Sequence, residues 1–158
     1  ILISMLLIFK NIFFESTLLL KNLGNTSIDP ELALTNKKPT FFEFYADWCE
    51  ICKEMAPKIN ALKTQYEDQM NFVFLNVDNP KWNKYIQDFD VNGIPHINLF
   101  NSDTDLEATF VGLQDEDLIR ESIEDLANEE NNYISVVSQN SSKIKNVEKN
   151  KISPRSHG

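Results

Sequence analysis

Glycine, cysteine and basic residues are scarce in this chain. It has four glycines and two cysteines among its 158 residues, and no GxGxxG, GKS or GKT string. Without such glycines the sequence cannot form a glycine-rich phosphate-binding loop. Two cysteines are too few for a disulfide-dense scaffold, or for a zinc site of four thiolates within one chain. Fifteen Lys and Arg against twenty-four Asp and Glu give a net charge of −9, which argues against nucleic acid as a partner.

A hydrophobic run long enough to cross a membrane is also lacking. A spanning helix needs ~20 mostly apolar residues, whereas the apolar stretch at the start of the chain is shorter and contains Lys10. Residues 15–30 hold no small-residue cleavage site of the kind that follows a signal peptide. We therefore expect residues 1–20 to be an uncleaved, incomplete membrane anchor. The alternative is an amphipathic helix that packs on the domain.

The length and composition predict one compact domain with a polar segment on each side. The segment 21–38 is expected to be a linker with one short helix, in which Asp29 is the N-cap and Pro30 the first helical residue. The domain is expected to cover residues 39–127. Residues 128–158 are rich in Asn, Ser and Lys, a composition typical of a disordered tail.

Strands and helices alternate within the domain. Residues 40–46 form a nearly continuous apolar run, which is typical of a central strand covered on both faces. Their order, β-α-β-α-β-β-α, predicts an α/β fold. The other strands are expected at 72–77, 97–100 and 106–111, and the helices at 49–68, 80–88 and 115–127. In the first helix, the expected buried stripe is Ile51, Met55, Ile59 and Leu62, with a kink at Pro57.

Both cysteines lie in one Cys-x-x-Cys string, Cys49 and Cys52, at the start of the helix that follows the first strand. Two intervening residues allow the sulfurs to bond within one helical turn. The unpaired N–H groups and the positive end of the helix dipole favour the thiolate of the first cysteine. Zinc and iron–sulfur sites use the same spacing. The strand-to-helix position, with no further cysteine in the chain, favours a redox pair.

The sequence from about 39 to 127 resembles the thioredoxin family. The string Phe44–Lys53 matches the active-site sequence of that family, and Pro57 matches the proline that kinks its active-site helix. Ile94-Pro95 matches the cis-proline loop, and Val111-Gly112 matches the glycine near the end of the last strand. The resemblance implies a thioredoxin-like fold with a central mixed sheet flanked by helices.

The same resemblance implies a role for three residues in catalysis. Cys49 is expected to be the nucleophile that attacks a substrate disulfide, and Cys52 the thiol that resolves the mixed disulfide. Glu43 occupies the place of the family's buried acid and is expected to accept the proton of Cys52, because a carboxylate in an apolar strand has a raised pKa. The alternative is a Glu43 that points to solvent. No metal and no cofactor beyond the Cys49–Cys52 disulfide is implied.

Four further residues are expected to bind the substrate: Trp48, Ile94, Pro95 and Gly112. Trp48 is expected to shield the thiols and shape the docking surface, although it could be a plain core aromatic. The peptide before Pro95 is expected to be cis, with the Ile94 backbone offering a strand-like edge to the substrate. His96 follows this loop and has two interpretations, a group that stabilises the Cys49 thiolate or a structural histidine.

Two departures from the family pattern concern electrostatics. Glu50 opposes thiolate formation at the neighbouring Cys49, and the helix dipole, worth ~0.3–1 kcal/mol for an exposed group, roughly offsets it. This balance favours a reductant over a strong oxidant. Phe74 stands where many thioredoxins have a lysine beside the buried acid, so that electrostatic partner is lacking.

A narrower resemblance is to the membrane-anchored, TxlA-like thiol:disulfide interchange proteins of photosynthetic membranes. It rests on residues 43–57, on the Gly-Ile-Pro-His-Ile string at 93–97 and on the apolar N-terminus. It implies a protein held by its N-terminus on a thylakoid or plasma membrane, with its domain on the lumenal or periplasmic side. The implied partners are an upstream thiol donor and disulfide-containing proteins, such as factors of cytochrome maturation or membrane-complex assembly.

Two other functions are compatible with the residues. The same chemistry run in the opposite direction gives a disulfide oxidase or isomerase. A non-catalytic module is the other alternative, either a scaffold or a protein in which two chains each donate Cys49 and Cys52 to a shared metal centre.

Overall fold

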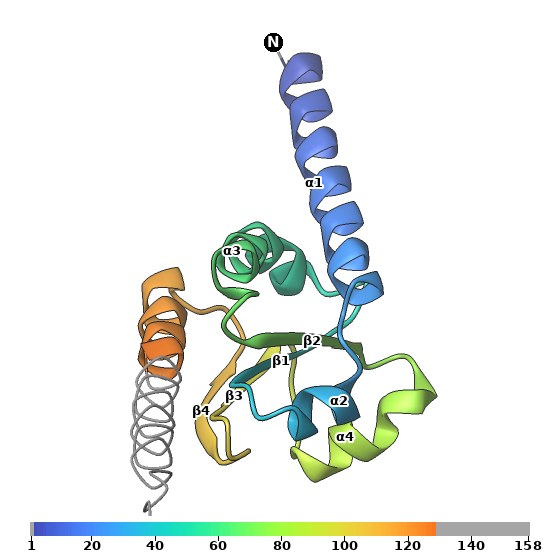
Figure 1. Ribbon diagram of the computed structural model, residues 1–158. Helices are drawn as coiled ribbons and strands as arrows, with labels where there is room; N and C mark the ends of the chain where they lie inside the picture. Colours follow the sequence, from blue (N-terminus) through green and yellow to red (C-terminus); the bar gives the residue numbers. More distant parts are fainter. Residues whose placement is uncertain (1, 129–158) are drawn as a thin grey trace, which may run out of the picture.

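A mixed four-stranded sheet forms the centre of the molecule. The computed structural model describes residues 2–128, without the side chains of 2–4 and 6–13. In this range the sheet has the order β2-β1-β3-β4 (Figure 1). β1 and β2 are parallel, and β3 is antiparallel to both β1 and β4. The strands are β1 (Thr40–Tyr45), β2 (Asn71–Asn76), β3 (His96–Phe100) and β4 (Leu106–Val111).

β1 is central because its side chains are apolar on both faces. All six of its residues are buried. Alternation along the strand sends Phe41 into one layer of the core, and Phe42 and Phe44 into the other. The expectation of a doubly covered strand at this position is confirmed.

Helices cover both faces of the sheet. α3 (Glu50–Tyr66), the end of α1 (Leu2–Asn25) and the helix at 116–128 lie on one side, and α2 (Pro30–Thr35) and α4 (Asn83–Asp88) on the other (Figure 1). A 3-10 turn, η1 (Pro80–Trp82), leads into α4. In α2 the Asp29 carboxylate accepts the N–H groups of Glu31 and Leu32, so the predicted cap is present.

The buried stripe of α3 differs from the prediction at one residue. Met55, Ile59 and Leu62 are buried as expected, but Ile51 is 38% exposed. Cys52 takes its place in the core. Only one face of the first turn contacts the core, and Cys52 lies on that face while Ile51 does not.

The expected linker begins too early. α1 continues to Asn25, so residues 21–25 are helical. Leu20 and Leu23 are each 1% exposed and belong to the core cluster that also contains Cys52. Residues three apart share a helix face, and this apolar face keeps the last turns of α1 on the domain. The packed unit therefore includes residues well before 39.

The ends of the chain were expected to be an anchor and a tail. Within the described part of the chain, no helix combines the length and the hydropathy that crossing a bilayer requires. The polar tail expected from 128 falls on residues 129–158, which lie outside the described residues, and residue 128 itself is helical.

We predict that Gly24→Ala destabilises the fold, because a methyl group at Gly24 would lie 2.0 Å from Tyr45 Oη. Such overpacking costs about 1–3 kcal/mol. The gain in helix propensity is only about 0.5–1 kcal/mol. Urea denaturation should show a lower free energy of unfolding for Gly24→Ala, and a smaller loss in a Tyr45→Phe background. Equal losses in the two backgrounds would contradict this explanation. Gly93→Ala, with its new methyl 3.4 Å from Val111, is the matched control.

Candidate active site

A disulfide joins Cys49 and Cys52 at the start of α3. Their Cα atoms are 5.2 Å apart. Cys49 is the N-cap of the helix, and its sulfur accepts the Cys52 N–H at 3.2 Å. Cys49 is 6% exposed, whereas Cys52 is completely buried. An incoming sulfur can therefore approach Cys49 but not Cys52, which agrees with the predicted order of attack.

The charge of Glu50 has a partner in the same turn of the helix. Lys53 Nζ lies 3.1 Å from Glu50 Oε1, and its side chain is largely buried. From the sequence, only the helix dipole offsets the effect of Glu50 on the Cys49 thiolate. The Lys53 ammonium adds positive charge one turn from Cys49, so the net field at this sulfur favours the thiolate more than the sequence alone indicates.

Glu43 is completely buried in β1. Neither of its carboxylate oxygens has a hydrogen-bond partner within the described residues. Its register neighbours are Phe74 on β2 and Ile97 on β3, both apolar. Burial raises the pKa of Glu43 to about 8. The alternative in which this side chain points to solvent is therefore wrong.

The environment of Glu43 also connects it to the disulfide. Phe41 and Tyr45, two residues away on either side, belong to the core layer that holds Cys52. Side chains two apart on a strand share one face. Glu43 thus lies in the layer beneath α3, where the predicted proton transfer from Cys52 would take place.

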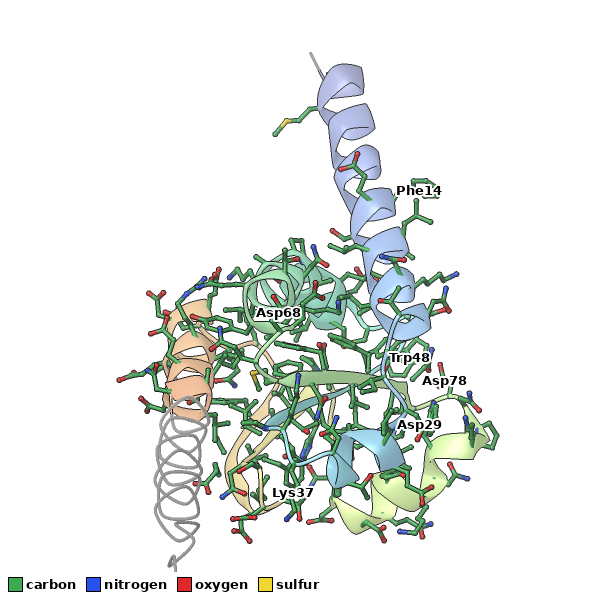
Figure 2. The ribbon with its side chains drawn as sticks, in the orientation of Figure 1. Phe14, Asp29, Lys37, Trp48, Asp68 and Asp78 are labelled. Atoms are coloured by element: carbon green, nitrogen blue, oxygen red, sulfur yellow. A yellow bond between two sulfur atoms is a disulfide. The ribbon has the colours of Figure 1, made fainter. Side chains whose placement is uncertain are left out.

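Trp48 lies on the surface next to the disulfide. It is 64% exposed, and its Nε1–H donates to Asp78 Oδ2 at 2.9 Å. Figure 2 shows both side chains near the foot of α1. The interpretation of Trp48 as a core aromatic is wrong. Its position is the one expected of a residue that shapes a docking surface.

The loop before β3 meets the end of β4 beside this site. The Ile94-Pro95 peptide is cis, as predicted. The Gly112 N–H donates to the Pro95 carbonyl at 2.8 Å, and Gly112 has φ +78°, a conformation that favours glycine. Because His96 pairs with Phe44, this loop reaches the end of β1, where the disulfide loop begins.

His96 lies on the opposite face of the sheet from the disulfide. Its ring packs edge-on against Phe44, 6.0 Å between centroids, and its Nε2 lies 3.1 Å from Asn98 Oδ1. Its neighbour Ile97 belongs to the layer that holds Cys52, so alternation turns His96 away from it. Burial lowers the pKa of His96. The geometry supports the structural interpretation and not that of a thiolate stabiliser.

Sequence reasoning also missed a contact that reaches the site from α1. Lys21 on α1 lies 3.7 Å from Asp47 Oδ2, just before Trp48. The Asn76 amide donates to the same carboxylate at 3.3 Å. The composition around Lys21 predicts a linker, and no pattern in the sequence relates this residue to a loop 26 residues further on. A helix prediction that extended through 25 would have been the signal.

Comparison with known proteins decides the family. The family model described as Thioredoxin matches residues 23–125. The chain belongs to the thioredoxin family. The solved structures agree with this. Thioredoxin O2 of Arabidopsis thaliana, in its oxidised state, matches with a TM-score of 0.54 at 25% identity, over 61% of this chain and 82% of that one. Yeast mitochondrial thioredoxin 3 matches with a TM-score of 0.52 at 27% identity, over 61% and 85%.

Two relatives belong to the narrower group. The chloroplastic thioredoxin-like protein HCF164 of Arabidopsis thaliana is 37% identical over 158 residues, which are 99% of this chain and 60% of that protein. A thiol:disulfide interchange protein TxlA homolog of Synechocystis sp. is 40% identical over 128 residues, 80% of this chain and 71% of the relative. The predicted family and fold are confirmed, and the chain spans about three fifths of the length of HCF164.

We predict that Glu43 makes the stability of the oxidised protein depend on pH. The folded-state pKa of about 8 lies above the ordinary 4.5, so the folded state holds this proton more tightly. The stability that Glu43 contributes is complete below pH 4.5 and is lost as the pH rises towards 8. The slope is about 1.4 kcal/mol per pH unit. Between pH 5 and 8, urea denaturation should show the wild type losing up to about 4 kcal/mol relative to Glu43→Gln. Parallel pH profiles would contradict this prediction.

We predict opposite effects of Glu50→Gln and Lys53→Gln on the reactivity of the reduced protein. Removing Glu50 removes a negative charge next to Cys49 and should speed its alkylation by iodoacetamide at pH 7. Removing Lys53 should slow it. Each change is expected to be within about tenfold, since partly exposed ion pairs contribute about 1 kcal/mol or less. The double variant should react at nearly the wild-type rate, and two changes of the same sign would refute this explanation.

Proposed function

We propose that this protein is a membrane-tethered thiol–disulfide oxidoreductase that reduces disulfides in other proteins. The observation that carries the proposal is the pair of unequal sulfurs at the start of α3. Cys49 keeps 6% of its surface exposed, whereas Cys52 is completely buried in the core. Such a pair can form a mixed disulfide through one sulfur only and then resolve it from within.

The reaction starts from the dithiol form. The Cys49 thiolate attacks a substrate disulfide, one substrate sulfur leaves as a thiolate, and a mixed disulfide forms. Cys52 then loses its proton to the Glu43 carboxylate, directly or through water, and attacks the Cys49 sulfur. The second substrate sulfur leaves, the Cys49–Cys52 disulfide forms, and two electrons have passed to the substrate. An upstream thiol donor restores the dithiol.

Glu43 suits this proton transfer. With a pKa of about 8, both its protonated and its ionised forms are populated near neutral pH. The ionised fraction accepts a proton from Cys52, and the acid formed is stable in apolar surroundings. Phe74 in the neighbouring strand supplies no charge that would hold the group ionised.

The substrate is proposed to dock around Cys49. Trp48 is exposed and precedes Cys49 in the chain. The Ile94-Pro95 loop is hydrogen-bonded to Gly112 and lies next to the end of β1. The backbone of Ile94 is proposed to pair with the substrate chain next to its cystine. Exposed apolar side chains follow these segments in the chain and give the surface a hydrophobic component, namely Ile51 in the first turn of α3, Val111 at the end of β4 and Leu113 just after it.

Tethering and partners are proposed from the likeness to the TxlA-like group. The matching relatives are named a thiol:disulfide interchange protein and a chloroplastic thioredoxin-like protein. We propose a thylakoid or plasma membrane, reached through the apolar N-terminal part of α1, with the domain on the lumenal or periplasmic side. The proposed substrates are disulfide-containing proteins such as cytochrome-maturation or membrane-complex assembly factors.

The test is reduction of insulin by the full chain with dithiothreitol as donor. We expect turnover by the wild type and none by Cys49→Ser. Reduced Cys52→Ser, freed of dithiothreitol before insulin is added, should accumulate a mixed disulfide, since its internal attack is lost. A wild-type rate equal to that of Cys49→Ser would refute the proposal. Thioredoxin has a reduction potential of about −270 mV, and a value well above this for the present protein would instead indicate an oxidase or isomerase.

A further inference from the structure

The last turns of α1 are attached directly to the active-site segment. Lys21 pairs with Asp47, and Gly24 lies so close to Tyr45 that even a methyl group would not fit. Both partners immediately precede the disulfide loop. Leu20 and Leu23 fix the same turns to the core. The family match begins at residue 23, so residues 2–22 of α1 precede it, and among them Lys21 contacts the segment that leads to Cys49.

The rest of α1 extends away from the body of the molecule. Figure 1 shows the helix leaving the sheet and α3 behind, and Phe14, labelled in Figure 2, lies on the free part. Phe14 and Leu18 are exposed, one turn apart. At 1.5 Å per residue, Leu2 lies about 27 Å along the axis from Leu20.

No break in the helix separates the part of α1 that extends away from the part that packs on the domain. α1 is one helix from Leu2 to Asn25, and neither proline nor glycine occurs before Gly24. A flexible linker would allow the domain to take many distances from the anchoring surface and many orientations. A continuous helix with a docked end transmits the direction of its free end to the loop of Cys49.

We infer that α1 is a rigid spacer that presents the Cys49–Cys52 pair at one height and one orientation above the surface that holds its free end. The substrates are then disulfides fixed at that height on proteins of the same membrane, and soluble disulfides are not favoured. This inference rests on the proposed tethering and reductase activity. It adds the class of substrate, membrane-bound proteins with a disulfide at a defined distance from the bilayer.

The experiment places enzyme and substrate on one bilayer. The full chain is extended at its N-terminus by a 20-residue leucine–alanine helix that continues α1 and spans phosphatidylcholine vesicles. Substrates are spanning peptides with helical ectodomains of stepped lengths, each ending in a disulfide-closed loop. One variant carries 18 helical residues of Glu-Ala-Ala-Ala-Lys type between Phe14 and Glu15. The matched control carries 18 Gly and Ser residues at the same place.

A rigid spacer predicts three distinct profiles of rate against substrate length. The unmodified helix should give one maximum with about a tenfold fall on either side, since geometry controls effective concentration. The helical insert of five whole turns keeps the orientation and should move the maximum by about 27 Å. The Gly-Ser insert should flatten it. A flat profile for the unmodified helix, or the same profile for both inserts, would overturn the inference.

Reduction of soluble insulin separates this result from the proposed function. All three proteins should reduce insulin at the same rate, because both insertions lie outside the docked turns. If none of them reduces insulin, the proposed reductase is refuted and the inference falls with it. If all reduce insulin and the length profiles do not differ, only the rigid spacer is refuted.

Discussion

The burial of β1 on both faces is the constraint on which the rest of the structure depends. Every residue of this strand is covered, and the strand ends at Tyr45. Four residues later Cys49 caps α3, and its sulfur accepts the Cys52 N–H. The position of the reactive sulfur is therefore set by the packing of aromatic side chains in a strand, and the helix start then supplies the field that activates it.

Glu43 is the one costly group in this packed strand. An ionised carboxylate without a hydrogen bond is strongly disfavoured in an apolar layer, and the raised pKa of about 8 is the expression of that cost. Phe74, in place of a charged neighbour, leaves the cost uncompensated. The site thus gains an acid that can exchange a proton near neutral pH, at the expense of stability when that acid ionises.

Patterns that depend on local residues predicted most of the fold and the site. A few adjacent residues suffice to predict the structure of the aromatic run of β1, of the Cys-x-x-Cys string and of the Ile94-Pro95 loop. The misses depend on tertiary contacts. Ile51 fits a helical stripe, but Cys52 occupies the buried position in the first turn of α3. Gly24 resembles a loop residue, although it allows α1 to approach Tyr45. The partner of Asp47 also became visible only in three dimensions. The Glu50–Lys53 pair, by contrast, is three residues apart on a predicted helix and was open to sequence reasoning.

The position of α1 alters what counts as the domain. Removal of a buried leucine side chain costs about 2–5 kcal/mol, and a whole domain is stable by only about 5–15 kcal/mol. A fragment that begins at residue 39 would lose both Leu20 and Leu23 from the core cluster that holds Cys52. It would also expose the Tyr45 ring and free Asp47 from Lys21. The end of α1 therefore packs on the domain, as in the alternative to the anchor, and it is part of the structure that supports the redox site.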